Sequence, residues 1–207
     1  MNIIYLLFHG LSPYSGISKK ILYQVKGFET CGHRVSLCTY SIADNGHRVR
    51  MINNEIIEDY GTGKPAAAKR RVSYQCIYRY AITHQVELIY VRSFHNANPF
   101  TIRLFSKLRK AGIKIAMEIP TYPYDSEYAG FPLVTRLGIQ VDKVFRKTLA
   151  KHVNAIVTFS DYHCIFGQRT IQISNGVDFD SIPLKKTVSK NTSVIHLLGV
   201  AEVHYWH

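Results

Sequence analysis

The amino-acid sequence predicts an α/β fold, in which a doubly wound parallel sheet of about six or seven strands carries helices on both faces. Continuous apolar runs open the chain at residues 2–8 and recur at 86–92, 113–117 and 154–158. Such runs are typical of parallel strands, which are buried on both faces of a sheet. Segments with apolar residues at helical spacing separate the runs, and this alternation indicates βαβ units.

The composition is that of a globular domain with a sizeable core. The chain has 207 residues, of which 46% are hydrophobic and 19% are charged. No apolar run reaches about 18 residues, so no transmembrane helix is expected, and the first residues lack the basic region of a signal peptide. The cysteines are scattered without metal-ligand spacing, which predicts a cytoplasmic protein with reduced core thiols and no metal site: Cys31, Cys38, Cys76 and Cys164.

The charge is strongly basic and unevenly distributed. The net charge is +12, and residues 64–114 contain eleven Lys and Arg against one acid, Glu87. A basic surface favours phosphate-bearing partners, namely a nucleotide, an anionic lipid or a nucleic acid. No RNA-binding signature is present, so nucleic acid is not expected. Peripheral association with the inner face of a membrane through the basic surface is one interpretation, and a merely solvated surface is the commoner one.

The first βαβ unit contains a glycine loop before its helix. The strand at 2–8 leads into this loop, and the helix ends before Gly32, which fits the left-handed position after a helix. Five residues separate Gly10 from Gly16, so the loop matches neither the P-loop nor the dinucleotide-binding pattern. What remains is a helix start whose free N–H groups suit an anion or a sugar hydroxyl.

The later elements continue the alternation. Further strands are expected at 34–40, 55–60 and 170–173, and helices at 64–85, 99–111 and 133–151. The last of these helices is amphipathic, with an apolar side of Val134, Leu137, Val141, Val144 and Phe145 and a basic side of Arg136, Lys143, Lys147 and Lys151.

The C-terminal part of the sequence changes in character. Residues 182–193 are rich in Lys, Ser and Thr, as a linker is, and an apolar strand at 194–200 follows them. The sequence therefore predicts a first domain at 1–181, a linker at 182–193 and, at 194–207, the first strand of a second domain.

One turn-rich segment, residues 117–128, stands out chemically. It contains the acids Glu118, Asp125 and Glu127 and three tyrosines, two of which are Tyr122 and Tyr124. Its prolines prevent strand or helix from continuing, so we expect a stiff loop that leaves the carboxyl end of a strand, where open α/β sheets bind ligands. A capped connection with solvated acids is an equally good interpretation.

Several motifs in order then resemble the N-terminal half of a GT-B glycosyltransferase of the large retaining family 4, which has a Rossmann-like fold. The resemblance runs nearly end to end. It rests on the strand–loop–helix with Gly16, on Gly32-His33-x-Val35, on residues 87–92, on the segment 115–127, on residues 155–160, and on Ile173-x-Asn175-Gly176-Val177-Asp178. The EIPTYPY sequence is similar to subgroups that build bacterial surface polysaccharides.

The resemblance implies transfer of a sugar from a nucleotide-sugar donor to a glycan or lipid-linked acceptor, without a further cofactor or metal. It implies that Gly16 and Ile17 approach the donor. It also places Glu118 where many members have a histidine that touches the donor sugar, which makes Glu118 the catalytic candidate. The acceptor candidates lie on the same loops: His9, Arg92, Tyr122, Tyr124, Asp125, Glu127 and Ser160.

Alternatives stand beside these roles. Glu118 could be a capped structural acid, and Arg92 could pair with a nearby acid instead of an acceptor phosphate. The tyrosines could only stiffen their loop, and His9 could be structural. Because the family holds most of its donor on the second domain, the chain alone is expected to be incompetent in transfer. The competing function is a non-catalytic nucleotide-binding or regulatory α/β module.

Overall fold

The computed structural model describes residues 1–92, 96–124 and 133–182. The chain divides into two compact units, residues 1–176 and 177–207. The described part of the second unit contains a short 3-10 helix, η2 (Phe179–Ser181). The predicted linker beyond Ile182, the predicted strand at 194–207, and the candidates Asp125 and Glu127 lie outside the described residues.

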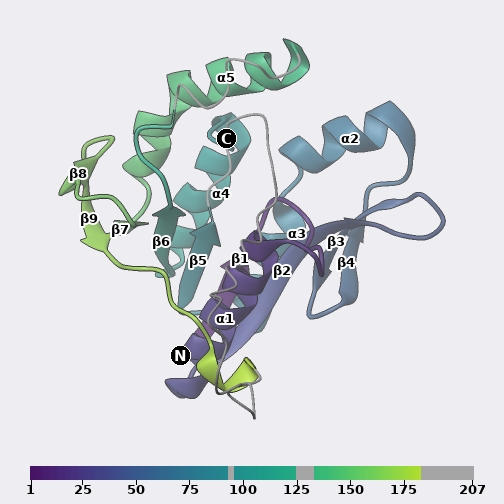
Figure 1. Ribbon diagram of the computed structural model, residues 1–207. Helices are drawn as coiled ribbons and strands as arrows, with labels where there is room; N and C mark the ends of the chain where they lie inside the picture. The colour runs from purple at the N-terminus through teal and green to yellow at the C-terminus, as the bar shows by residue number, and fades with distance from the viewer. Residues whose placement is uncertain (93–95, 125–132, 183–207) are drawn as a thin grey trace, which may run out of the picture. The chain divides into compact units, whose positions relative to one another are not determined.

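A nine-stranded, mostly parallel sheet forms the first unit in the described part of the chain, in the order β4-β3-β2-β1-β5-β6-β7-β9-β8 (Figure 1). The parallel strands are β1 (Asn2–Leu6), β2 (Arg34–Ile42), β5 (Leu88–Arg92), β6 (Lys114–Ile119), β7 (Ala155–Thr158) and β9 (Gln168–Gln172). Antiparallel strands flank them: β3 (Arg48–Ile52) and β4 (Glu55–Asp59) on one side, and β8 (Cys164–Ile165) on the other.

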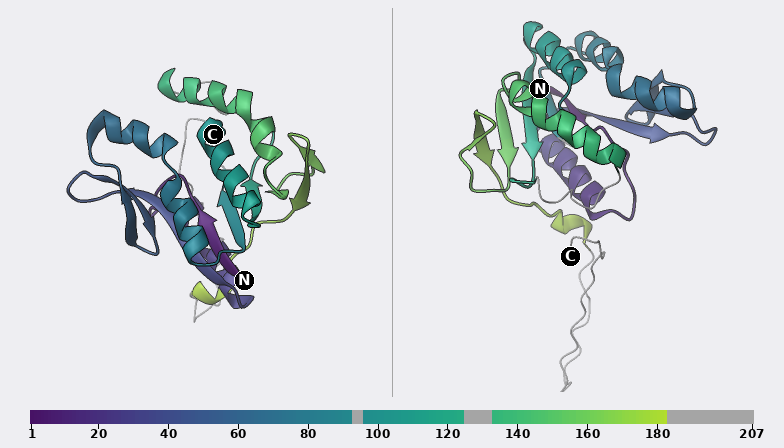
Figure 2. Two further views of the ribbon diagram at one scale, coloured as in Figure 1. Left: turned by 180° about the vertical axis from the view of Figure 1, so that it is seen from behind. Right: turned by 90° about the horizontal axis from the view of Figure 1, so that it is seen from above.

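Helices cover both faces of this sheet, which confirms the predicted doubly wound α/β fold (Figures 1 and 2). The helices are α1 (Gly16–Thr30), α2 (Gly63–Val72), α3 (Gln75–Thr83), α4 (Pro99–Lys110) and α5 (Leu133–Ala150). Successive residues of β1 point to opposite faces, so Tyr5 packs with Ile21 of α1 while Leu6 belongs to the core that contains Phe105 of α4. The central strand is therefore buried on both sides, as its apolar run predicted.

The ends of α1 follow the sequence closely. The Ser15 hydroxyl caps the helix by accepting from the N–H of Ser18 at 3.4 Å. Gly32 adopts a φ of +79° and donates its N–H to the Glu29 carbonyl, while His33 donates to Phe28. These two bonds form the Schellman motif, which confirms the predicted helix end at Gly32.

Some elements differ from prediction. The single helix expected at 64–85 is two helices, because Ser73 is extended and the buried Tyr74 donates its hydroxyl to the Arg71 carbonyl at 2.8 Å. Strand β3 was not predicted, because its arginines interrupt the apolar pattern by which a buried strand is recognised. Strand β6 runs two residues past the predicted end at 117, so Glu118 lies inside a strand and not in the loop.

Helix α5 exposes part of the side that was expected to be its apolar face. Leu137 and Val144 are 59% and 71% exposed, whereas Ile139, Asp142 and Leu149 are buried. Asp142 explains why α5 turns this side outward. Its Oδ1 accepts the N–H of Ala97, in the segment before α4, at 2.9 Å, and this bond holds the Asp142 side of α5 toward the core. None of the helices in the described ranges is both long and apolar enough for a membrane crossing.

Candidate functional site

The candidate site lies along one edge of the sheet. Strands β1, β5, β6 and β7 are parallel, so their carboxyl ends meet at the same edge. The loop that leads to Gly16 follows β1, Arg92 and Glu118 lie at the ends of β5 and β6, and Ser160 follows β7. Ligands of open α/β sheets bind outside this edge.

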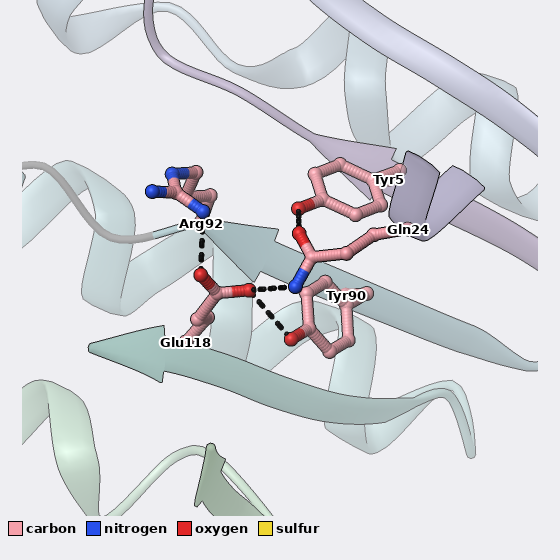
Figure 3. Close-up of polar contacts among 5 residues, drawn as sticks. All are labelled: Tyr5, Gln24, Tyr90, Arg92 and Glu118. Atoms are coloured by element: carbon pink, nitrogen blue, oxygen red, sulfur yellow. Dashed lines mark hydrogen bonds and ion pairs between the residues drawn. The ribbon is translucent and has the colours of Figure 1, made fainter. Parts of the chain in front are cut away.

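Glu118 is the centre of a buried polar network on this edge (Figure 3). Its Oε1 lies 2.5 Å from Nη1 of Arg92, which is directly opposite in the register of β5 and β6. Its Oε2 accepts from the Tyr90 hydroxyl at 2.7 Å and from Nε2 of Gln24 at 2.9 Å. Gln24 in turn accepts from the Tyr5 hydroxyl at 2.6 Å. One network thus joins α1 to β1, β5 and β6.

This geometry corresponds to the structural alternative for Arg92, which pairs with the nearby acid. Glu118 is completely buried, and both of its carboxylate oxygens have partners from the chain. The network holds α1 against the strand ends, and it presents no free oxygen to a reactant in this arrangement. A catalytic role for Glu118 stays a prediction, and the structure favours a positioning role for it.

The network has a defined electrostatic state. Burial raises the pKa of Tyr5 and of Tyr90, and the Glu118 carboxylate raises both further, so both phenols remain hydrogen-bond donors. Burial lowers the pKa of Lys20 to about 8, which the Glu118 carboxylate opposes. The Lys20 amine lies 3.5 Å from the ring centre of Phe159, just after β7.

The loop before α1 is open at Gly16 and closed at Gly10. A Cβ at Gly16 would meet nothing within 4 Å, and Gly16 does not have a positive φ. Neither conformation nor packing in the described chain therefore requires glycine there. A Cβ at Gly10 would lie 2.9 Å from the Tyr40 carbonyl oxygen, so Gly10 serves packing. Ile17 beside Gly16 is exposed.

The two tyrosines of the loop after β6 are packed in an aromatic cluster. The Tyr122 ring centre lies 5.0 Å from that of Tyr162 and 5.5 Å from that of Phe166, both near β8. Tyr124 is buried and approaches Phe166 at 6.4 Å, and Arg146 of α5 lies 4.7 Å above the Phe166 ring. These contacts stiffen the loop, and binding of an acceptor by the tyrosines stays a prediction.

The remaining candidates have local contacts. His9 is half-buried, with Nδ1 2.7 Å from the Gly10 carbonyl oxygen, and the Ser160 hydroxyl lies 2.9 Å from that of Thr158. Within the described ranges, no group of three or more His, Cys, Asp or Glu gathers as metal ligands would. Sequence reasoning missed Tyr5 and Tyr90, although hydroxyl-bearing residues inside apolar strand runs were an available signal.

Comparison with known proteins finds no matching family model, no matching curated protein and no matching solved structure. The site must therefore be interpreted from its own chemistry.

Proposed function

We propose that this chain is the acceptor-side, Rossmann-like domain of a retaining nucleotide-sugar glycosyltransferase. The observation that carries the proposal is the open helix start at Gly16. The N–H groups of Gly16 and Ile17 precede the first intrahelical bond, which joins Lys19 N–H to the Ser15 carbonyl at 3.1 Å. Free amides and the positive end of the helix dipole favour a phosphate or a sugar oxygen. The sequence motifs that resemble family 4 support the same assignment.

In this proposal the groups of the edge have distinct roles. Gly16 and Ile17 receive the diphosphate or the sugar of the donor. The network of Glu118, Arg92 and Gln24 holds α1, and hence that helix start, in place. His9, Tyr122, Tyr124 and Ser160 lie on the loops that would meet a glycan or lipid-linked acceptor. Such a transferase would serve the synthesis of a cell-surface polysaccharide from the cytoplasmic side.

Substitution of Gly16 tests the helix start directly. In Gly16→Ala the new methyl group occupies the space that the ligand would use, so we expect affinity for nucleoside diphosphates and their sugars to fall at least about tenfold. Gly27→Ala is the matched control, because Gly27 is an exposed glycine of the same helix with nothing within 4 Å of its Cβ position. Both variants should fold normally.

Calorimetric titration with UDP, GDP and TDP and with their sugars measures this difference. Equal affinity in the two variants would show that Gly16 does not contact the nucleotide. Because the chain alone is expected to be incompetent in transfer, sustained release of nucleoside diphosphate with glycan or lipid-linked acceptors would contradict that expectation. Binding of the bare nucleoside diphosphates as tight as that of their sugars would favour the non-catalytic nucleotide-binding module instead.

Helix α5 supports the proposed association with a membrane surface. Its exposed apolar residues Leu137 and Val144 share the helix with the exposed Arg136 and Lys147. An amphipathic helix of this kind lies in the interface of anionic lipid. If the acceptor is lipid-linked, this surface would bring the site to it.

Vesicle flotation tests the α5 surface. We expect the chain to float with phosphatidylglycerol vesicles at low salt, and to float less at moderate salt because the charges are screened. Val144→Glu should lose most of the bound fraction, whereas Ile82→Glu, which adds the same charge at an exposed apolar residue of α3, should not. Equal flotation with phosphatidylcholine vesicles would contradict the expectation.

A further inference from the structure

Three arginines surround Tyr40 near the end of β2. Nη1 of Arg48 donates to the Tyr40 hydroxyl at 2.7 Å. The guanidinium carbon of Arg70, from α2, lies 4.1 Å from the centre of the Tyr40 ring. Arg50 lies directly opposite Tyr40 in the register of β2 and β3. Guanidinium groups from β3 (Arg48 and Arg50) and from α2 (Arg70) therefore lie close to one another around Tyr40.

Two of these guanidinium groups carry buried nitrogens without a partner. Arg50 is only 1% exposed, and Nη1 donates to the Leu7 carbonyl at 2.8 Å, but Nε has no hydrogen-bond partner among the described residues. Nε of Arg70 is likewise buried, with no partner in the part of the chain that the structure describes. Native structures satisfy nearly all buried donors, because an unsatisfied one costs free energy. Two such donors in one cluster are consistent with an acceptor that the described part of the chain does not supply.

The acids of the adjacent strand form their ion pairs with residues outside the cluster. Among the described residues, Glu58 of β4 pairs with Lys69 at 4.0 Å and Asp59 pairs with His47 at 2.7 Å. No ion pair within the described ranges reaches Arg48, Arg50 or Arg70.

Crowding of like charges acts on Arg70. Burial lowers the pKa of Arg70, and the nearby guanidinium groups of Arg71, Arg48 and Arg50 lower it further, while Tyr40 opposes them. An anion among these groups would offset the free-energy cost of burying the charge and would reduce the repulsion between the arginines.

The cluster also lies where ligands of such folds are found. The Tyr40 N–H donates to the His9 carbonyl at 3.3 Å, and the Tyr40 carbonyl oxygen approaches Gly10. The arginines are thus beside the loop that follows β1, at the carboxyl edge of the sheet. They are a separate set of groups from the network of Glu118.

We propose that Arg48, Arg50 and Arg70 form a binding site for a phosphoryl oxyanion, as a phosphate ester or a diphosphate carries. The planar guanidinium group matches such oxygens with paired hydrogen bonds. The half-buried Arg48 and Arg70 contact the oxygens, and the buried Arg50 provides charge behind them. The inference is independent of sugar transfer, because it depends on the clustered guanidinium groups and not on the helix start at Gly16.

Titration calorimetry of the full chain with pyrophosphate at low salt tests the site. We expect saturable binding that weakens as salt rises, and at least about tenfold weaker binding in Arg70→Gln and in Arg48→Gln. Arg103→Gln is the matched control, since it removes the same charge from an exposed position of α4 and should bind as the unaltered chain does. Absence of saturable binding would overturn the proposal. An equal loss of affinity in Arg103→Gln would also overturn it, because attraction by net charge alone would then explain binding.

Competition experiments distinguish the two sources of a phosphoryl group. Competition by glucose 1-phosphate would assign the site to soluble phosphate esters, and competition by vesicles of phosphatidic acid would assign it to a lipid headgroup.

Hydrogen exchange on the unaltered chain avoids any effect of substitution on folding. Pyrophosphate should slow exchange of amides in β3 and α2, and unchanged exchange there at saturating pyrophosphate would refute the assignment to these arginines.

Discussion

Replacement of Glu118 by alanine is expected to lower the free energy of unfolding by about 3–5 kcal/mol, which is the usual cost of removing one partner of a buried ion pair. The variant leaves the Arg92 guanidinium buried without its counter-charge. It also removes the acceptor of the Tyr90 hydroxyl and of the Gln24 amide. Urea unfolding followed by circular dichroism measures the change.

Two comparisons make this expectation specific. Glu87→Ala removes an acid that is 58% exposed and pairs with the N-terminus at 3.9 Å, so its cost should stay below about 1 kcal/mol. The double variant Arg92→Ala with Glu118→Ala no longer buries a lone charge, so it should cost less than the two single changes added together. A cost for Glu118→Ala no larger than that for Glu87→Ala would refute the structural role of the network.

Replacement of Phe105 by alanine should also cost about 3–5 kcal/mol, through the lost burial of the ring and the cavity that remains. Phe105 is 1% exposed in the core between α4 and the sheet. Phe100 lies on the same helix but is 46% exposed, so Phe100→Ala should change stability by less than about 1 kcal/mol.

The same urea unfolding experiment serves both phenylalanine variants. The slopes of the transitions should stay equal, because neither change alters the surface that unfolding exposes by much. A Phe100→Ala variant as unstable as Phe105→Ala would mean that α4 packs with its other side toward the sheet.

The fold was predictable where local chemistry and tertiary environment agree. The strands β1, β5, β6 and β7 are apolar runs, and the glycine after α1 marks its end without help from distant residues. Strand β3 was not predictable from its pattern, because Arg50 is an arginine that only the folded chain buries. The orientation of α5 depends on Asp142, whose partner is the backbone of Ala97 in another segment.

The candidate site divides in the same way. The position of Glu118 near a strand end followed from sequence, as did the open helix start at Gly16. The pairing of Glu118 with Arg92 depends on the register between β5 and β6, and the bond to Gln24 depends on how α1 lies on the sheet. Neither relation is local, so the sequence alone could indicate Glu118 and Arg92 but not that they pair with each other, and it gave no signal for Gln24.

The central place of β1 has a consequence for how the chain folds during synthesis. β1 pairs on one side with β2, which begins at Arg34, but its other neighbour is β5, which begins only at Leu88. Until residue 92 has left the ribosome, one edge of an almost fully buried strand has no native partner. Such pairing between distant segments is slow, and an unpaired apolar edge favours association between incomplete chains. The interval between completion of β2 and emergence of β5 is therefore the one in which association between nascent chains is most favoured.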